Sequence, residues 1–205
     1  MALGCDTAAE LTESRLHTLV GGGYTFAGRY LNALSRRPAE VARISNSGLY
    51  IVSLYEWGSP TSIRYFTAEQ GRTDAVRAIQ AAGSIGQPDK TPIYFTVDYD
   101  ASHSDITGGI TQYLQAVKKV FEDPGGERRY ELGLYGSGAV LSYFKNTYTY
   151  TWLAGAAAWR GSKNYKDWSI RQYGNNTTIG SGAGQVAIDK DESNGAAGGW
   201  RPHKL

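Results

Sequence analysis

Several features by which protein classes are recognised are scarce in this sequence. Cys5 is the only cysteine among 205 residues, which excludes a disulfide within the chain and a thiolate metal cluster. No run of about 18 apolar residues occurs, so we expect no membrane-spanning helix. Lysine and arginine number 21 against 19 aspartates and glutamates, and their longest runs are pairs. Such balanced charge argues against a nucleic-acid partner.

Signals for export and for cofactors are missing as well. The first residues, MALGCD, do not contain a basic segment followed by an apolar one, so we expect no signal peptide in this chain. The histidines His17, His103 and His203 have neither HxH nor HxxxH spacing, which argues against zinc. No GxGxxG follows the first predicted strand, and no GxSxG occurs. We therefore expect no cofactor and no resident metal.

Tyrosine, tryptophan and glycine are abundant instead, at 15, 5 and 26 residues. Tyrosine and tryptophan combine a flat apolar face with a polar tip, which suits stacking on sugar rings as well as ordinary packing. The hydrophobic content of 41% is typical of a globular domain with a substantial core.

Eight short runs with strand character are separated by segments with helical periodicity. The predicted strands are residues 2–6, 24–30, 49–56, 93–98, 130–135, 150–157, 168–173 and 185–189. The predicted helices are residues 8–20 with Thr7 as the N-cap, 38–47, 67–83 and 104–121.

This alternation predicts an α/β fold with a parallel sheet, and eight strands favour closure into a single (β/α)8 barrel of the TIM type. Few residues separate the last three predicted strands, so we expect an irregular barrel with abbreviated helices in the C-terminal half. An open doubly wound sheet is less favoured because its glycine-rich phosphate turn is missing. We expect one domain, residues 1–192, that includes a flexible loop at 174–184. A glycine-rich tail, residues 193–205, follows and ends in HKL, which we interpret as a cloning remnant.

The stretch PIYFTVDYD, residues 92–100, ends an apolar strand with two aspartates. Alternate residues of a strand share a face, so the side chains of Asp98 and Asp100 are expected to project together. In a barrel the catalytic groups lie at the carboxyl ends of the strands. Neighbouring carboxylates also raise the pKa of one of the pair, which suits acid and base chemistry.

The other predicted strands end in polar or aromatic residues too. These are Asp6, Arg29 with Tyr30, Glu56, Tyr135, Trp159, Arg171 with Gln172, and Asp189, and Trp57 follows Glu56. Each has an ordinary structural explanation when taken alone: a helix cap, a turn carboxylate or a salt-bridge arginine. Clustered carboxylates also suit Mg²⁺ or Ca²⁺. Their convergence on one rim of one barrel favours a functional site.

The order of motifs along the chain resembles that of a known family. GCDTA, FAGRYL, GLYIVSLYEWG, PIYFTVDYD, GLYGSG, AAAWRG, IRQY and VAIDKD follow one another as in the glycoside-hydrolase-like domain catalogued as domain of unknown function 1906. That family is similar to glycoside hydrolase family 25, the lysozyme-type muramidases. The resemblance covers residues 4–191. It implies an irregular (β/α)8 barrel that is exported and acts at the bacterial cell envelope.

The resemblance also implies roles for individual residues. Positions that line the saccharide groove of the muramidases correspond here to Asp6, Asp98 with Asp100, Tyr135, Gln172 with Tyr173, and Asp189. Asp100 stands where the muramidases carry the glutamate taken as general acid, and its side chain is shorter by about 1 to 1.5 Å. Glu56, at the end of the adjacent strand, is the alternative acid.

We therefore predict a lysozyme-like glycosidase that acts on peptidoglycan or a related N-acetylated glycan. The predicted catalytic residues are Asp98, Asp100, Glu56 and Asp6, and the predicted substrate-binding residues are Arg29, Trp57, Tyr135, Trp159, Gln172 and Asp189. Two alternatives stay open: a glycan-binding module of the cell envelope without competent chemistry, and a metal-dependent hydrolase. We expect a monomer that is secreted or held in the cell envelope, with a polysaccharide as its partner.

Overall fold

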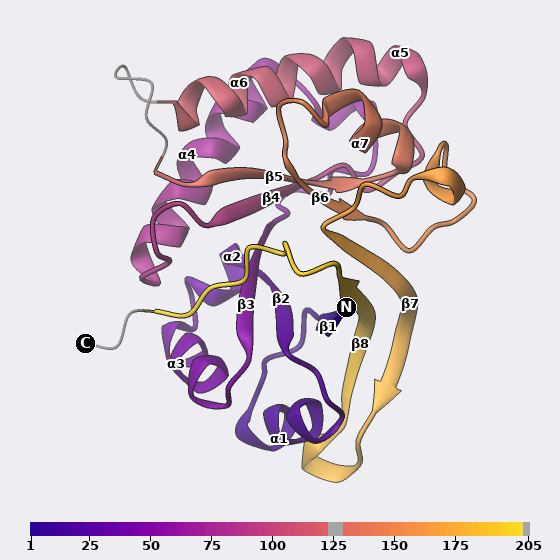
Figure 1. Ribbon diagram of the computed structural model, residues 1–205. Coiled ribbons are helices and arrows are strands. Elements are labelled where there is room, and N and C mark those ends of the chain that lie inside the picture. The colour runs from indigo at the N-terminus through magenta and orange to yellow at the C-terminus, as the bar shows by residue number, and fades with distance from the viewer. Residues whose placement is uncertain (123–128, 203–205) are drawn as a thin grey trace.

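Eight strands hydrogen-bond to one another in chain order and close into a barrel (Figure 1). The computed structural model describes residues 1–122 and 129–202, so the predicted cloning remnant and His203 lie outside the described residues. The strands are β1 (Ala2–Asp6), β2 (Phe26–Tyr30), β3 (Tyr50–Tyr55), β4 (Pro92–Thr96), β5 (Glu131–Gly136), β6 (Tyr150–Leu153), β7 (Ile170–Ile179) and β8 (Val186–Ser193). The predicted eight-stranded barrel is confirmed.

Helices follow the early strands, and short turns replace them later in the chain. The helices are α1 (Glu13–Gly21), α2 (Leu31–Leu34), α3 (Pro38–Asn46), α4 (Ala68–Ser84), α5 (His103–Asp105), α6 (Thr111–Phe121) and α7 (Gly138–Phe144). The shorter turns are η1 (Ile63–Tyr65), η2 (Ile106–Ile110), η3 (Ser162–Asn164) and η4 (Gly182–Gly184). Since η3 and η4 are the helical elements that join β6, β7 and β8, the abbreviated C-terminal half is confirmed. No helix among the described residues is both long enough and apolar enough to cross a membrane.

Strand β8 runs in the opposite direction to its neighbours. Strands β1 to β7 pair in parallel, whereas β8 is antiparallel to both β7 and β1. The prediction of an all-parallel sheet was therefore wrong at this strand. Only residues 180–185 join β7 to β8, and a parallel crossover needs about a dozen or more. The chain turns back instead, with Gly180 and Gly182 at φ values of 73° and 53° that favour glycine.

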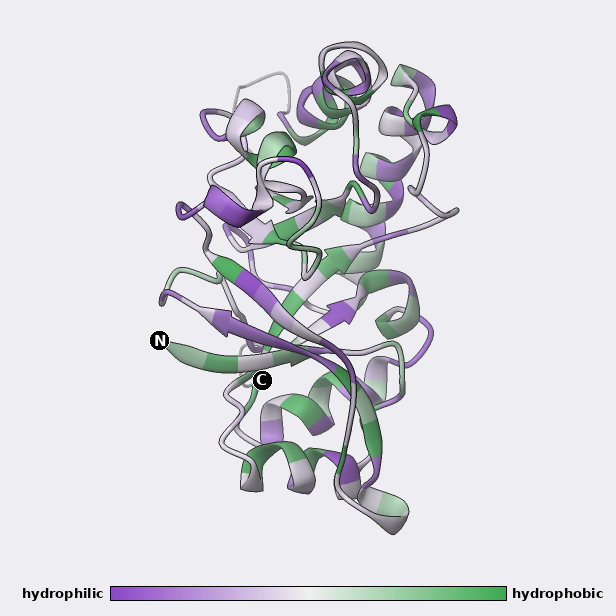
Figure 2. Cartoon of the chain, turned by 90° about the vertical axis from the view of Figure 1, so that its right-hand side faces the viewer, coloured by the Kyte–Doolittle hydropathy of each residue, from purple (hydrophilic) through white to green (hydrophobic). Residues whose placement is uncertain are grey.

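The predicted flexible loop at 174–184 is mostly strand, because β7 continues to Ile179. Hydrophilic and hydrophobic residues mix along β7 and β8 in Figure 2, and exposed positions recur along β7. This pattern fits a long hairpin with one face on the protein and one in water. The hairpin therefore extends the barrel wall past residue 173, at which the seventh strand was expected to stop.

Helix α1 begins later than predicted. Its N-cap is Thr12, whose hydroxyl accepts a hydrogen bond from the Arg15 N–H. The predicted N-cap, Thr7, instead donates a hydrogen bond from its hydroxyl to the carbonyl of Ala187 in β8. Residues 7–12 therefore form a loop between β1 and α1, and Thr7 at its start contacts β8. This placement keeps Asp6, the last residue of β1, beside β8.

The barrel interior is filled by large side chains that lie against glycines. Trp152 and Tyr94 are fully buried, and their rings meet edge to face at 5.5 Å. A Cβ at Gly28 would lie 2.4 Å from the Trp152 ring, and a Cβ at Gly133 would lie 2.7 Å from the Tyr94 ring. The narrow barrel thus needs small residues opposite large ones. Truncation of Trp152 to alanine is expected to cost roughly 3–5 kcal/mol of stability.

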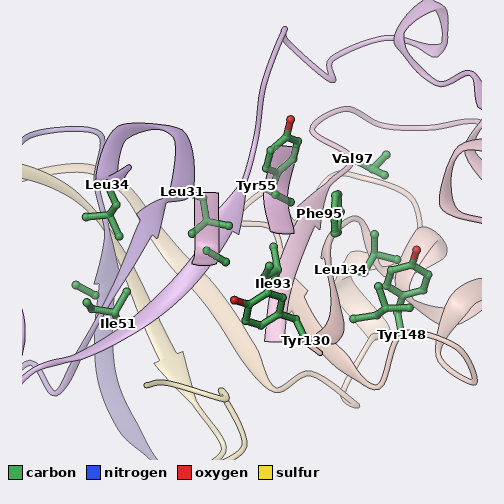
Figure 3. Packing of buried hydrophobic residues seen from close by; sticks show 14 of the residues in the cluster. Leu31, Leu34, Ile51, Tyr55, Ile93, Phe95, Val97, Tyr130, Leu134 and Tyr148 are labelled. Atoms are coloured by element: carbon green, nitrogen blue, oxygen red, sulfur yellow. The ribbon is translucent and has the colours of Figure 1, made fainter. Parts of the chain in front are cut away.

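A second core lies between the barrel and its helices. Figure 3 shows Ile93 and Phe95 of β4 on this outer side, near Tyr55 of β3 and Leu134 of β5. Helices α4 and α6 lie side by side over this face (Figure 1). Their close approach needs Gly71, at which a Cβ would lie 2.4 Å from a carbonyl oxygen of α6.

The segment after β8 lies across the N-terminal end of the barrel. It passes in front of β2 and β3 in Figure 1, where Trp200 is buried and pairs with Ile51. The Trp200 indole N–H donates to the Ser53 hydroxyl at 2.9 Å, and the Tyr94 hydroxyl donates to the Ala197 carbonyl. Residues 194–202, expected to be a tail, therefore close the end of the barrel that lies away from the candidate site.

Candidate active site

A cavity of about 220 Å³ opens at the carboxyl ends of the parallel strands. It is lined by Asp6, Tyr30, Leu54, Glu56, Asp98, Tyr135, Gly155, Ala156, Trp159, Gln172, Asn175 and Asp189. Seven of the ten predicted site residues are in this set. Every strand or the segment just after it contributes, so closure of the barrel is what brings these distant positions together.

Gln172 of β7 organises one side of the cavity. Its Nε2 donates to Asp6 at 2.9 Å and to Asp189 at 3.0 Å. Its Oε1 accepts from the Tyr135 hydroxyl at 3.1 Å and from the Gly155 N–H at 2.9 Å. An amide offers two donors and two acceptor lone pairs, so each has a partner here. Gln172 thus fixes the positions of both carboxylates.

Burial changes the acidity of Asp6. It is 5% exposed, and loss of hydration followed by the nearby charge of Asp189 raises its pKa from 3.8 to about 7, although the Gln172 hydrogen bond opposes the rise. Asp191 lies beneath it in β8 and is fully buried. Burial and the charge of Asp6 raise the pKa of Asp191 well above its usual value.

Burial therefore favours the neutral form of Asp191. The Trp152 indole N–H donates to its Oδ1 at 3.0 Å, whereas its Oδ2 has no hydrogen-bond partner among the described residues. The interaction of the two carboxyl groups raises the pKa of Asp191. Asp191 lies beyond the predicted end of the last strand at residue 189, and it was not among the predicted site residues.

Glu56 and Asp98 lie on the other side of the cavity. Burial, then the charge of Asp98, raises the pKa of Glu56 from 4.5 to about 7. Burial, then Asp189, raises the pKa of Asp98. Near neutral pH, Glu56 is thus partly protonated and can donate a proton. The backbone N–H of Asp98 donates to the Pro60 carbonyl at 3.0 Å, which holds the two loops together.

The sequence model of one domain family matches residues 17–193, most of the chain. That family is described as the Rv2525c-like, glycoside hydrolase-like domain. This chain belongs to that family. The predicted family membership is confirmed, and the domain is glycoside hydrolase-like.

One relative of this Rv2525c-like domain is the uncharacterized protein YbfG of Bacillus subtilis. The two are 33% identical over 217 residues, which covers 97% of this chain and 29% of YbfG. The chain thus spans less than a third of that relative's length.

Two solved structures share the fold of the Rv2525c-like domain. The Mycobacterium tuberculosis Tat-secreted protein Rv2525c, crystallised with L-tartrate, has a TM-score of 0.78 and 21% identity, with 97% of this chain and 98% of that chain covered. The modular autolysin LytC of Streptococcus pneumoniae, in complex with a synthetic peptidoglycan ligand, has a TM-score of 0.53 and 13% identity. That match covers 93% of this chain and 46% of LytC. At these identities the likeness concerns the fold.

Asp100 lies outside the cavity of this Rv2525c-like domain. Its carboxylate forms a salt bridge with Arg160 at 2.9 Å and accepts from the Arg160 backbone N–H at 2.8 Å. Strand β4 ends at Thr96, so the alternation that was expected to align Asp98 with Asp100 does not extend to residue 100. The charges coupled to Asp98 are those of Glu56 and Asp189.

Arg29 points away from the cavity. In β2, Gly28 lies against the barrel interior and Tyr30 lines the cavity, so the residue between them faces the helices. Arg29 is fully buried there, bound to Glu40 of α3 at 2.7 Å and to the Thr7 carbonyl. Its position is structural, because it joins β2, α3 and the loop after β1.

Trp57 also lies outside the cavity. It is 36% exposed, and the guanidinium groups of Arg36 and Arg77 lie 5.4 and 5.8 Å from its ring centroid. The side chain of Glu56, the preceding residue, lines the cavity, whereas the Trp57 side chain does not. Trp159, in the loop after β6, is the tryptophan that lines the cavity.

Sequence reasoning placed Tyr30 at a strand end but did not include it among the predicted site residues, and it did not select Asn175. Strand alternation could have identified Tyr30, since it shares a face with Gly28. No local signal marked Asn175, because it lies in a segment expected to be a loop. A Cβ at Gly155 would lie 2.4 Å from Asn175 Oδ1, so this glycine lets β7 approach the cavity. Among residues 1–122 and 129–202, no three His, Cys, Asp or Glu side chains are grouped to hold a metal ion.

Proposed function

We propose that this domain hydrolyses a glycan of the bacterial cell envelope, with Glu56 as proton donor and Asp98 as the ionised carboxylate. One observation carries the proposal. Glu56 lines a cavity at the catalytic rim of the barrel together with Asp98, and the pKa of Glu56 is raised to about 7. Glycosidases need such a pair, one carboxyl protonated and the other charged.

The reaction follows from these two groups. Protonated Glu56 donates its proton to the glycosidic oxygen while the bond from that oxygen to the anomeric carbon breaks. Asp98 stabilises the positive charge that develops on the sugar or orients an N-acetyl carbonyl that bonds to the anomeric carbon. The resulting Glu56 carboxylate takes a proton from water as the water oxygen adds to that carbon. This second step restores protonated Glu56 and releases the hydrolysed sugar.

The remaining cavity residues are proposed to bind the sugar. Asp6 and Asp189 are held by Gln172 and can accept hydrogen bonds from sugar hydroxyls. Trp159 offers an indole face for ring stacking. Peptidoglycan is the proposed substrate, supported by the LytC complex, and secretion is supported by the description of Rv2525c as Tat-secreted.

Release of reducing ends from purified peptidoglycan and chitooligosaccharides tests the proposal. The Glu56→Gln and Asp98→Asn variants should each lose about 10²- to 10⁴-fold in rate, since each removes a group that acts in the transition state. Asp100→Asn is the matched control, because it neutralises a carboxylate outside the cavity and should keep the rate within about threefold. If the wild type binds these glycans without releasing reducing ends, the hydrolase proposal is wrong.

A glycan-binding module is the second candidate, and the position of Asp100 favours it. The resemblance implied a general acid at this place, yet the carboxylate of Asp100 is engaged by Arg160. If Glu56 does not replace that acid, the cavity keeps its hydrogen-bonding groups but lacks a proton donor. Binding without turnover is the result that supports this candidate.

A further inference from the structure

A second cavity, of about 340 Å³, adjoins the acidic one. Both are lined by Gly155 and Gln172. The other residues of this second cavity are Leu153, Ala154, Ala157, Ser162, Lys163, Tyr165, Lys166, Arg171 and Tyr173. Three cationic side chains and no carboxylate line it, whereas four carboxylates line its neighbour. We call it the basic pocket.

The basic pocket exists because the connection from β6 to β7 is short. A full crossover helix would cover the outer face of these strands, but residues 154–169 contain only the turn η3. Arg171, on β7, therefore keeps a side chain that is 42% exposed. The abbreviated half of the barrel thus opens a space beside the catalytic rim.

The turn that supplies the lysines is fixed in place. A Cβ at Gly138, the first residue of α7, would lie 2.3 Å from the Gly161 carbonyl oxygen, so the turn packs directly on that helix. The Gly138 N–H donates to the Ser162 hydroxyl at 3.0 Å. The Tyr165 hydroxyl and the Thr151 hydroxyl both donate to the Asp167 carbonyl. These contacts hold the backbone on both sides of Lys163 and Lys166.

The charges of the pocket are available to a ligand. Neither Lys163 nor Lys166 forms a salt bridge with any residue that the structure describes, and both are exposed. Arg171 pairs with Glu192 across the hairpin and lies 5.2 Å from the Trp168 ring centroid. An anionic group would be repelled by the carboxylates of the first cavity and attracted by these ammonium groups.

We propose that the basic pocket is a subsite for an anionic substituent, a carboxylate or a phosphate, on the glycan that occupies the acidic cavity. This inference rests on the proposed function for the glycan itself. The shared wall of Gly155 and Gln172 places the anion on the sugar residue at the cleavage point or on the next one. The pocket thereby selects charged glycans over neutral ones.

Calorimetric binding of three small probes tests the subsite. The probes are chitobiose, which is neutral, the disaccharide of N-acetylglucosamine and N-acetylmuramic acid, which has a carboxylate, and N-acetylglucosamine 6-phosphate. The wild type should bind at least one anionic probe about three- to tenfold more tightly than chitobiose, as two exposed ion pairs allow. The preferred anionic probe identifies carboxylate or phosphate as the group recognised.

The double variant Lys163→Gln, Lys166→Gln should abolish this preference and leave chitobiose binding unchanged. Lys119→Gln, Lys145→Gln is the matched control, because it removes the same charge from exposed positions outside the pocket and should keep the preference. Equal binding of all three probes by the wild type, or an equal loss of all three in both double variants, overturns the subsite.

The test of the basic pocket can be separated from the test of the proposed hydrolase function. Glu56→Gln should lose turnover and keep the anion preference. If the wild type shows the preference without turnover, the hydrolase proposal fails and the subsite stands. If it hydrolyses glycans without the preference, the subsite fails and the hydrolase proposal stands.

Discussion

Asp6 and Asp189 stand opposite one another in the antiparallel pairing of β1 with β8, and a single amide group, Nε2 of Gln172, donates to both carboxylates. The charge of Asp189 contributes to the raised pKa of Asp6. The hydrogen bond from the Gln172 amide lowers the pKa of Asp6 and so offsets part of this rise. Because β8 is reversed, this arrangement joins the first and last strands of the barrel at the candidate site.

Replacement of Gln172 should therefore weaken the protein most when the carboxylates are charged. Gln172→Met keeps the length of the side chain but removes both donors, and we expect a loss of about 1–3 kcal/mol in the free energy of unfolding at pH 8. The loss should shrink at pH 5, where Asp6 is protonated. Urea unfolding at the two pH values measures this, with the exposed Gln112→Met on α6 as control. An equal loss at both pH values contradicts the assigned role.

Asp191 provides a test of the buried proton. Burial favours the neutral form of Asp191, so Asp191→Asn, which is neutral and keeps an acceptor for the Trp152 indole N–H, should stay within about 1 kcal/mol of the wild type in stability. Asp191→Leu leaves the indole N–H without a partner, so it should cost about 2–3 kcal/mol. Chemical unfolding of the two variants compares them. Equal destabilisation by the two variants would contradict a neutral Asp191 carboxyl.

Much of this arrangement was predictable from strand ends. The carboxyl ends of parallel strands meet on one rim, so Asp6, Glu56, Asp98, Tyr135 and Gln172 were placed together by topology alone. Residues far apart in the chain can therefore be placed on one rim of the barrel when each strand is identified from the sequence.

Other positions depended on geometry that local sequence does not encode. The face on which Arg29 lies depends on the register of β2, and the direction of Asp100 depends on the residue at which β4 stops. The antiparallel β8 follows from the hairpin at 180–185, whose residues also fit a flexible loop. Asp189 was expected at a strand end and lies inside β8, yet it reaches the cavity because β8 continues past the rim.

The raised pKa of Asp6 predicts how stability depends on pH. Between about pH 4 and pH 7 the folded state holds a proton that the unfolded chain has released, so stability falls as the pH rises through about 7. A rise from 3.8 to about 7 corresponds to at most about 4 kcal/mol. Asp6→Asn cannot ionise, so its free energy of unfolding should fall less between pH 5 and pH 8. Parallel urea titrations check this, and identical falls in both proteins would disprove it.

The pH dependence of turnover should report the proton on Glu56. The acid must be protonated to act, and its pKa is raised to about 7, so kcat/KM should decline as the pH rises above about 7. Burial is the first cause of this raised pKa and the charge of Asp98 is the second. Asp98→Asn removes that charge, so it should move the alkaline limb of any residual activity to lower pH. Asp100→Asn should leave the limb in place, because its carboxylate is bound to Arg160 outside the cavity. If Asp98→Asn leaves the limb in place, the titrating proton is not on Glu56. Loss of the limb in Asp100→Asn would then assign the proton to Asp100.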